Sequence, residues 1–146
     1  MRIPRQLVNL YPPFLGAGIR VKSKPDFTEL SSEIKLRGWN RNYVGTHFGG
    51  SIYSMTDPFY MVMLIEQLGS GYRVWLKEAT VRFRRPGRGT VRAEFRLEPA
   101  TVAELKTKVD AVGKEEIVLP VTVEDDHGSV VAEVSQTLHV RRRARR

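Results

Sequence analysis

The side chains best suited to acid–base or donor chemistry gather in one short segment of the chain. This segment contains Asn42, His47, Gly49, Gly50 and Asp57. An aspartate on a buried helix loses solvation and becomes a stronger base, and an asparagine amide donates hydrogen bonds. Glycines at a helix start let a substrate approach backbone amides closely, and the helix dipole favours negative charge there. These residue types suit a general base beside an anion-binding backbone.

Each of these residues also has a purely structural interpretation. Asp57-Pro58 has the pattern of a helix N-cap followed by a proline in the first turn, and in this interpretation the helix starts at Asp57. If the helix starts earlier, Pro58 lies inside it, costs ~3 kcal/mol and predicts a kink. Asn42 in a loop rich in turn formers is more often part of an Asx turn. Gly49-Gly50 also fits a tight turn, and His47 fits a hydrogen-bonded loop histidine.

Metal and thiol chemistry find no support in the sequence. The chain has no cysteine, which excludes a disulfide, a thiolate nucleophile and a zinc–thiolate site. Its three histidines, His47, His127 and His139, are scattered and do not have the spacing of metal ligands. We therefore expect neither a metal ion nor a resident cofactor.

Hydrophobic periodicity predicts one long buried helix and several strands around it. Residues 51–69, which follow the double glycine, form the most apolar stretch and are apolar on most sides. The periodicity predicts strands over 27–37, 74–85, 90–97, 115–124 and 129–140, with a bulge near Glu78. It also predicts an amphipathic helix over 101–112, with Thr101 as its N-cap. Residues 3–18 favour a short helix that breaks near Pro12.

This order of elements indicates an α+β fold in a single domain, residues 1–146. We expect an N-terminal helical segment over 1–20 and a solvated basic tail over 141–146. A sheet wrapped around one apolar helix leaves an edge strand that needs covering. A second copy of the chain would cover it, so we expect a homodimer or a dimer of dimers.

The formal net charge of +8 raises the question of an anionic partner. Five arginines lie in residues 141–146, and a second group brackets the hairpin at 82–92. No aromatic–basic interleaving or recognition-helix pattern accompanies them, so nucleic acid is an unlikely partner and an anionic small ligand explains the charge equally well. The start of the chain lacks a signal-peptide pattern, and no apolar run approaches the ~20 residues of a membrane span. We expect a cytoplasmic protein without a membrane partner.

The stretch Asn42-Tyr-Val-Gly-Thr-His-Phe-Gly-Gly50, followed seven positions later by Asp57, resembles the signature of PaaI-like hotdog thioesterases. Those proteins carry an Asn, a Gly, a His-Gly-Gly and then an acidic residue at this spacing. The turn Arg84-Arg-Pro-Gly-Arg-Gly89 matches one of their hairpins. The resemblance covers residues 5–141 and extends to a branch of the superfamily known as a domain of unknown function. It implies a hotdog fold, a long central helix wrapped by a five- to six-stranded antiparallel sheet.

The resemblance also implies a function, acyl-CoA thioesterase, with coenzyme A as part of the substrate and a site at a dimer interface. It makes Asp57 the general base or nucleophile and the Gly50 N–H the oxyanion donor, with Gly49 allowing close approach. Asn42 would orient the attacking group or the thioester carbonyl. Among the hairpin arginines, Arg82, Arg84, Arg85 or Arg88 would meet the phosphates of coenzyme A, because guanidinium groups match phosphate oxygens bidentately, with Arg84, Arg85 and Arg88 as the named candidates. The alternative is that these arginines form a solvated face of the hairpin.

Two positions depart from the family pattern. Phe48 directly precedes the double glycine, and the histidine, His47, lies one position earlier. Pro58 follows the acid inside what should be continuous helix. These departures leave a second hypothesis open, a non-catalytic hotdog protein that binds acyl-CoA or another ligand with an apolar tail. Hydration or dehydration of an acyl thioester ranks last, because it needs a well-placed histidine beside the acid.

Overall fold

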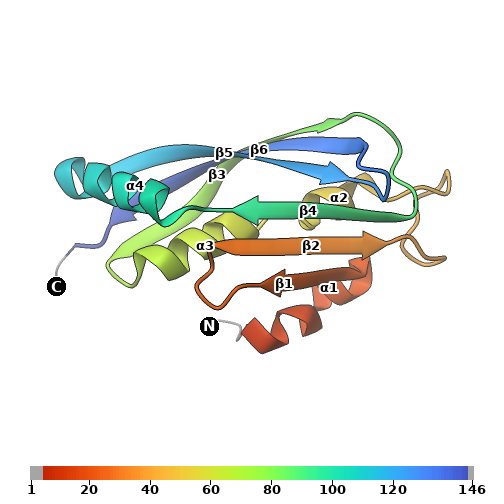
Figure 1. Cartoon of the computed structure of the whole chain (residues 1–146), viewed down its shortest axis with the longest axis horizontal. Coiled ribbons are helices and arrows are strands. Elements are labelled where there is room, and N and C mark those ends of the chain that lie inside the picture. The colour runs from red at the N-terminus through yellow and green to blue at the C-terminus, as the bar shows by residue number, and fades with distance from the viewer. Residues whose placement is uncertain (1–4, 145–146) are drawn as a thin grey trace.

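Alternating apolar and polar residues build six strands, which join in one antiparallel sheet in the order β1-β2-β4-β5-β6-β3 (Figure 1). The computed structural model describes residues 5–144. The strands are β1 (Ile19–Ser23), β2 (Glu29–Lys35), β3 (Tyr72–Phe83), β4 (Thr90–Arg96), β5 (Lys114–Glu124) and β6 (Val130–Arg142). The predicted α+β fold is thereby confirmed.

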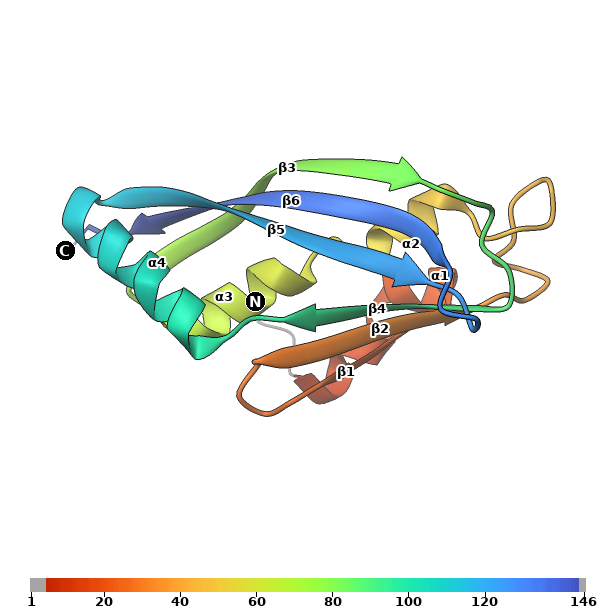
Figure 2. The ribbon, with the colours of Figure 1, turned by 45° about the horizontal axis from the view of Figure 1, so that its top comes forward.

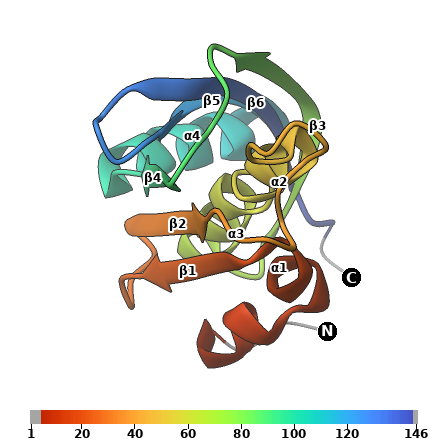
Figure 3. The same ribbon diagram turned by 90° about the vertical axis from the view of Figure 1, so that its right-hand side faces the viewer.

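The sheet curls around a central helical segment made of two helices. These are α2 (Gly49–Ser54) and α3 (Phe59–Leu68), and Figure 3 shows them end-on inside the curl. Helix α3 buries Phe59, Tyr60, Met63, Leu64 and Leu68 in the core. A helix apolar on several sides requires such an enclosing sheet. The remaining helices are the 3₁₀ helix η1 (Arg5–Leu10), α1 (Pro12–Ala17) and α4 (Pro99–Val112).

The curl opens between β4 and β5. These strands pair only at Arg92 with Glu124 and at Ala93 with Val123, and beyond these pairs they diverge (Figure 2). At the wide end α4 buries Val102, Leu105 and Val109. The helix therefore closes the core where the two halves of the sheet separate.

Several sequence predictions are confirmed in detail. The register of β3 against β6 shifts between Leu76 and Glu78, at the expected bulge. The N-terminal helical segment breaks before Pro12, where η1 ends and α1 begins. The central helix breaks before Phe59, as the proline at position 58 predicted.

Three predictions need correction. Strand β1 was not predicted, because its alternation extends over only five residues. Helix α4 begins at Pro99 with Glu98 as its N-cap, rather than at Thr101, because proline suits the first helical turn. The basic tail starts later than expected, because β6 continues to Arg142, which pairs with Tyr72 of β3. Residues 145–146 of that tail and residues 1–4 lie outside the described part of the chain.

The two edge strands of the sheet are β1 and β3. Strand β3 is 12 residues long, and among residues 5–144 it pairs only with β6, so the described chain leaves one side of its backbone without a strand. Helices η1 and α1 lie beside β1 at the other edge (Figure 3). No helix within residues 5–144 is long and apolar enough to cross a membrane.

Candidate functional site

The break in the central helix forms a joint at residues 55–58, and Asp57 lies in it. Helix α2 ends at Ser54, and the N-cap of α3 is Pro58, whose φ is −88° and ψ −11°. Pro58 has no N–H to give to a helix, so the backbone turns there. The N-cap position is thus occupied by Pro58 rather than by Asp57, and no side chain makes a cap hydrogen bond. The Asp57 carboxylate is left for other partners.

The sheet holds the carbonyl groups that the break in the helix leaves without helical partners. The buried Ser32 hydroxyl on β2 donates to the carbonyl of Met55. The Gln136 side chain on β6, fully buried, donates its Nε2 hydrogens to the carbonyls of Thr56 at 3.0 Å and Asp57 at 3.2 Å. Buried carbonyls without donors would destabilise the fold, so these bonds make the joint possible and fix the backbone of Asp57.

The Asp57 side chain is half-buried and is held by a tyrosine one turn earlier. The Tyr53 hydroxyl donates to Asp57 Oδ1 at 2.7 Å. In residues 5–144 no other protein group hydrogen-bonds this carboxylate, so Oδ2 remains available to a water molecule. Desolvation, and then the bond to Asp57, raises the pKa of the Tyr53 hydroxyl far above its ordinary value. The tyrosine therefore keeps its proton and acts only as a donor.

Gly49 and Gly50 form the start of α2, after the N-cap Phe48. Within the described chain their N–H groups donate to no protein acceptor, whereas Ser51 and Ile52 both donate to the Phe48 carbonyl. A Cβ at Gly50 would lie 2.5 Å from the Phe48 ring, and one at Gly49 would lie 3.2 Å from the Phe83 ring. Gly50 also lines a pocket of about 400 Å³ between α1, α2 and the loop at 39–41. Two unpaired amides therefore lie at an accessible helix start, flanked by two aromatic rings.

Asn42 forms an Asx turn, the structural alternative for this residue. Its Oδ1 accepts the N–H groups of Val44 and Thr46, and its Nδ2 donates to Thr46 Oγ1 at 2.9 Å and to the His47 carbonyl at 3.2 Å. The side chain uses its hydrogen-bonding capacity inside the loop. A direct contact with a substrate, as the sequence predicted, would require this loop to open.

His47 is buried at 3% exposure and links the site loop to the arginine hairpin. Its Nε2 lies 2.9 Å from the Gly89 carbonyl, and because a carbonyl only accepts, we place the proton on Nε2. The His47 N–H donates to the Gly87 carbonyl. A Cβ at Gly87 would lie 3.1 Å from the imidazole, so the ring packs directly on the hairpin backbone. The structure thus gives His47 a fixed structural position.

We expect His47 to make the protein less stable in mild acid. Burial lowers the pKa of this imidazole, and the bond to Gly89 offsets only part of the effect. Below about pH 6.5 the unfolded chain therefore binds more protons at this site than the folded one, so the free energy of unfolding falls as pH falls. Melting temperatures between pH 8 and pH 5 should fall more for wild type than for His47→Gln. His127→Gln, at an exposed turn, is the control and should follow wild type. Parallel curves for wild type and His47→Gln would contradict the expectation.

The three arginines expected to bind phosphate differ in what they already contact. Arg84 donates through Nε at 2.8 Å, and through Nη2, to Glu133 on β6. Arg85 and Arg88 are exposed, and their side chains make no ion pair or hydrogen bond with other described residues. The backbone N–H groups of Arg84 and Arg85 both donate to the Val131 carbonyl, which fixes the hairpin. Arg85 and Arg88 are thus the two available for an anion.

A large apolar pocket of about 820 Å³ lies along α3, between the two edge strands β1 and β3. The central helix lines it with Met61, Val62 and Ile65 of α3 and with Pro58, the residue after Asp57. The polar residues in its lining are Ser23, Glu66, Arg73 and Arg143, and the apolar ones include Phe14, Val21, Phe27, Leu30, Tyr72 and Val74. The size and lining are typical of a site for a small molecule.

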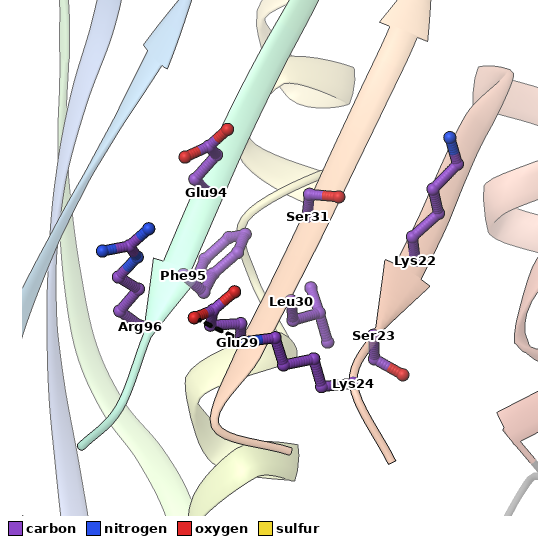
Figure 4. A pocket seen from close by; sticks show the side chains of 9 residues that line it. All are labelled: Lys22, Ser23, Lys24, Glu29, Leu30, Ser31, Glu94, Phe95 and Arg96. Atoms are coloured by element: carbon purple, nitrogen blue, oxygen red, sulfur yellow. Dashed lines mark ion pairs between the residues drawn. The ribbon is translucent and has the colours of Figure 1, made fainter. Parts of the chain in front are cut away.

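A further hollow, of about 340 Å³, lies on the exposed side of β1, β2 and β4 (Figure 4). It is open and charged, and its Lys24–Glu29 ion pair at 2.8 Å is exposed to solvent. In the part of the chain that the structure describes, no three His, Cys, Asp or Glu side chains gather to hold a metal ion. The hollow therefore offers no buried polar group that would select a ligand.

A curved antiparallel sheet around a buried central helix with a double-glycine start defines a hotdog-fold protein. Residues 2–140 match the family model described as "Domain of unknown function (DUF4442)", so the chain belongs to this family. The chain is similar to a solved Pseudomonas aeruginosa protein of unknown function, PA5026, described as a probable thioesterase, with 26% identity and a TM-score of 0.86. That match covers 98% of this chain and 99% of the other.

Two further solved structures share the fold at lower identity. The thioesterase HI1161 from Haemophilus influenzae is 13% identical with a TM-score of 0.67, over 97% of this chain and 93% of its own. The PaaI protein from Escherichia coli is 16% identical with a TM-score of 0.65, over 95% and 89%. None of the curated proteins matches this chain. The hotdog resemblance inferred from the sequence is confirmed.

Proposed function

We propose that this protein is an acyl-CoA thioesterase that uses Asp57 as its general base. The observation that carries the proposal is the Asp57 carboxylate, held at Oδ1 by Tyr53 and uncommitted at Oδ2, with the next residue, Pro58, in the lining of a large apolar pocket. The similarity to PA5026 over nearly the whole chain supports the same class of reaction. The fold alone would not support a particular reaction, because proteins of one fold catalyse many different reactions.

The chemistry uses Asp57 in the joint and the Gly50 N–H at the start of α2. Asp57 Oδ2 takes a proton from a water molecule as the water oxygen attacks the thioester carbonyl carbon. The carbonyl oxygen becomes an oxyanion, which the free Gly50 N–H at the start of α2 stabilises. Collapse breaks the carbon–sulfur bond, and Asp57 returns its proton to the leaving thiolate. The products are a carboxylic acid and free coenzyme A. Direct attack by the carboxylate is the nucleophilic variant of this scheme.

The acyl group would occupy the pocket along α3. Its walls at Met61, Val62 and Ile65 are apolar and lie next in the chain to the joint that holds Asp57. Burial of an apolar chain there contributes ~25 cal/mol per Å² removed from water. The pocket thus binds the part of the substrate that does not react and excludes water around the thioester.

The second copy that we propose pairs along β3. Antiparallel pairing of two β3 strands about a two-fold axis would bring the Phe83 end of one copy beside the Tyr72 end of the other. Phe83 packs on Gly49, and Tyr72 lines the apolar pocket. The helix start of one subunit would thereby face the pocket of its partner. Sedimentation equilibrium should give at least twice the 16.7 kDa chain mass, and a fully active monomer would contradict this arrangement.

We assign the phosphates of coenzyme A to the arginine hairpin, with Arg85 and Arg88 as direct contacts and Arg84 held beside them by Glu133. The double variant Arg85→Ala/Arg88→Ala should raise KM for acyl-CoA about 10-fold with kcat unchanged, because these contacts bind ground and transition states alike. Arg20→Ala/Arg96→Ala, on the exposed faces of β1 and β4, is the matched control. Equal KM values for the two double variants would contradict the assignment of the phosphates to the arginine hairpin.

One observation favours a second candidate, a binding protein without turnover. Phe48 stands where the family carries its histidine, and its ring lies against Gly50. Thermal stabilisation by acyl-CoA separates the two candidates. For a hydrolase the shift in melting temperature decays during incubation with wild type and persists with Asp57→Asn. A shift that persists equally with both proteins favours the binding protein.

A further inference from the structure

Tyr53 makes two hydrogen bonds with Asp57, although helix α2, which carries Tyr53, ends at Ser54. The Asp57 N–H donates to the Tyr53 carbonyl at 3.0 Å, and the Tyr53 hydroxyl donates to Asp57 Oδ1 at 2.7 Å. The Thr56 N–H donates to the same carbonyl at 2.8 Å. Tyr53 thus continues the helical spacing of four residues across the joint and places its ring over the turn.

The surroundings make this contact the main restraint on the carboxylate. No lysine, arginine or histidine in the described chain forms an ion pair with Asp57. Gln136 and Ser32 hold the backbone of the joint from the side of the sheet, but they do not touch the carboxylate. Rotation of the carboxyl group is therefore restrained by Tyr53 alone among these residues.

The hydroxyl is suited to this task because it stays protonated. Desolvation and the neighbouring Asp57 raise the pKa of Tyr53, so it donates throughout the pH range in which a carboxylate base works. Tyr53 uses one lone pair of Oδ1, whereas Oδ2 keeps both of its lone pairs for the proton of an attacking water. A base fixed in one orientation needs less reorganisation during proton transfer.

We propose that Tyr53 is a positioning residue, which orients Asp57 so that Oδ2 faces the attacking water. This inference rests on the proposed thioesterase function and adds to it a residue that the family signature does not contain. Tyr53 does not touch the reacting atoms in this scheme and acts through Asp57.

Tyr53→Phe is the direct test, since it removes one oxygen and keeps the ring. We expect kcat for thiol release from acyl-CoA to fall about 10-fold, because the variant loses the hydrogen bond to the charged Asp57 carboxylate. KM should change less than about two-fold, because the lost bond orients the base and does not bind the substrate. Tyr60→Phe is the matched control. The Tyr60 side chain is buried, and its hydroxyl donates to the Pro120 carbonyl at 2.7 Å, away from the carboxylate. Its removal should leave kcat unchanged.

A double-mutant cycle separates positioning from a structural effect. If Tyr53 acts through Asp57, Tyr53→Phe should cause no further loss in the Asp57→Asn background. An equal loss in both backgrounds, or an unchanged kcat in the single variant, would overturn the inference while leaving the thioesterase function in place. Wild type that releases no thiol from any acyl-CoA would instead overturn the proposed function, and the role of Tyr53 with it.

Discussion

Replacing Asp57 by asparagine is expected to lower kcat for acyl-CoA hydrolysis about 100-fold or more, the usual effect of losing a general base. The asparagine keeps the size of the side chain and can still accept the Tyr53 hydrogen bond at its amide oxygen. It cannot take a proton from water. Binding should therefore be preserved while turnover is lost.

A second aspartate in the chain provides the control for this variant. Asp110 on α4 accepts a hydrogen bond from the Tyr72 hydroxyl at 2.6 Å, the same pairing on an exposed surface. Asp110→Asn should leave kcat within about two-fold of wild type, because solvation compensates exposed polar contacts. If Asp57→Asn retained a third of the wild-type rate, the carboxylate would not be the base.

Replacing Gln136 by leucine is expected to lower the free energy of unfolding by about 2–3 kcal/mol. The variant leaves the carbonyls of Thr56 and Asp57 without their donor in a buried joint. The same change frees the backbone that carries Asp57, so kcat should fall as well. Urea unfolding and thiol release on the same preparation measure the two effects.

Gln67→Leu is the matched control, because it makes the same chemical change outside the joint. It tests whether the losses of stability and kcat in Gln136→Leu depend on the position of Gln136. Gln67 near the end of α3 also donates to two carbonyls, those of Phe27 and Leu97, but it is only half-buried. Water can replace part of what it loses, so its variant should lose less stability and no kcat. Equal effects of Gln136→Leu and Gln67→Leu on both measurements would contradict the role of the joint.

The fold was largely predictable because its strands alternate and its central helix is apolar on several sides. The bulge before Glu78 was visible as a change of phase in the same alternation. Strand β1 was not predictable in this way, because a five-residue strand offers too few repeats of the pattern. The start of α4 was misplaced because the proline at position 99 fixes the first turn more strongly than Thr101 can cap it.

The candidate site was predictable in its location but not in its internal bonds. The double glycine starts α2 as expected, whereas Asp57 lies in the joint between α2 and α3 and neither within a helix nor at an N-cap. Gln136 lies 79 residues from Asp57, and their contact depends on the sheet register. A signal did exist, since a glutamine alternates with Val134 and Leu138 on an inward face. The sequence signal for Tyr53 was weaker and consisted only of its spacing of four residues from Asp57.

Asn42 shows why residue type alone does not assign a role. An amide in a glycine-rich loop suits substrate binding and an Asx turn equally in chemical terms. The four hydrogen bonds that the Asn42 side chain makes within its own loop favour the turn. The sequence does not reveal this, because the bonds depend on how the loop closes on itself.

The most direct test of the account is free-thiol release by wild-type protein from short, long and aromatic acyl-CoAs. We expect release above background, proportional to enzyme concentration, and fastest for the acyl group that best fills the apolar pocket along α3. No release from any of these substrates, by a protein that acyl-CoA still stabilises against heat, would contradict the account. Asp57 and the double glycine would then be parts of a binding site without turnover.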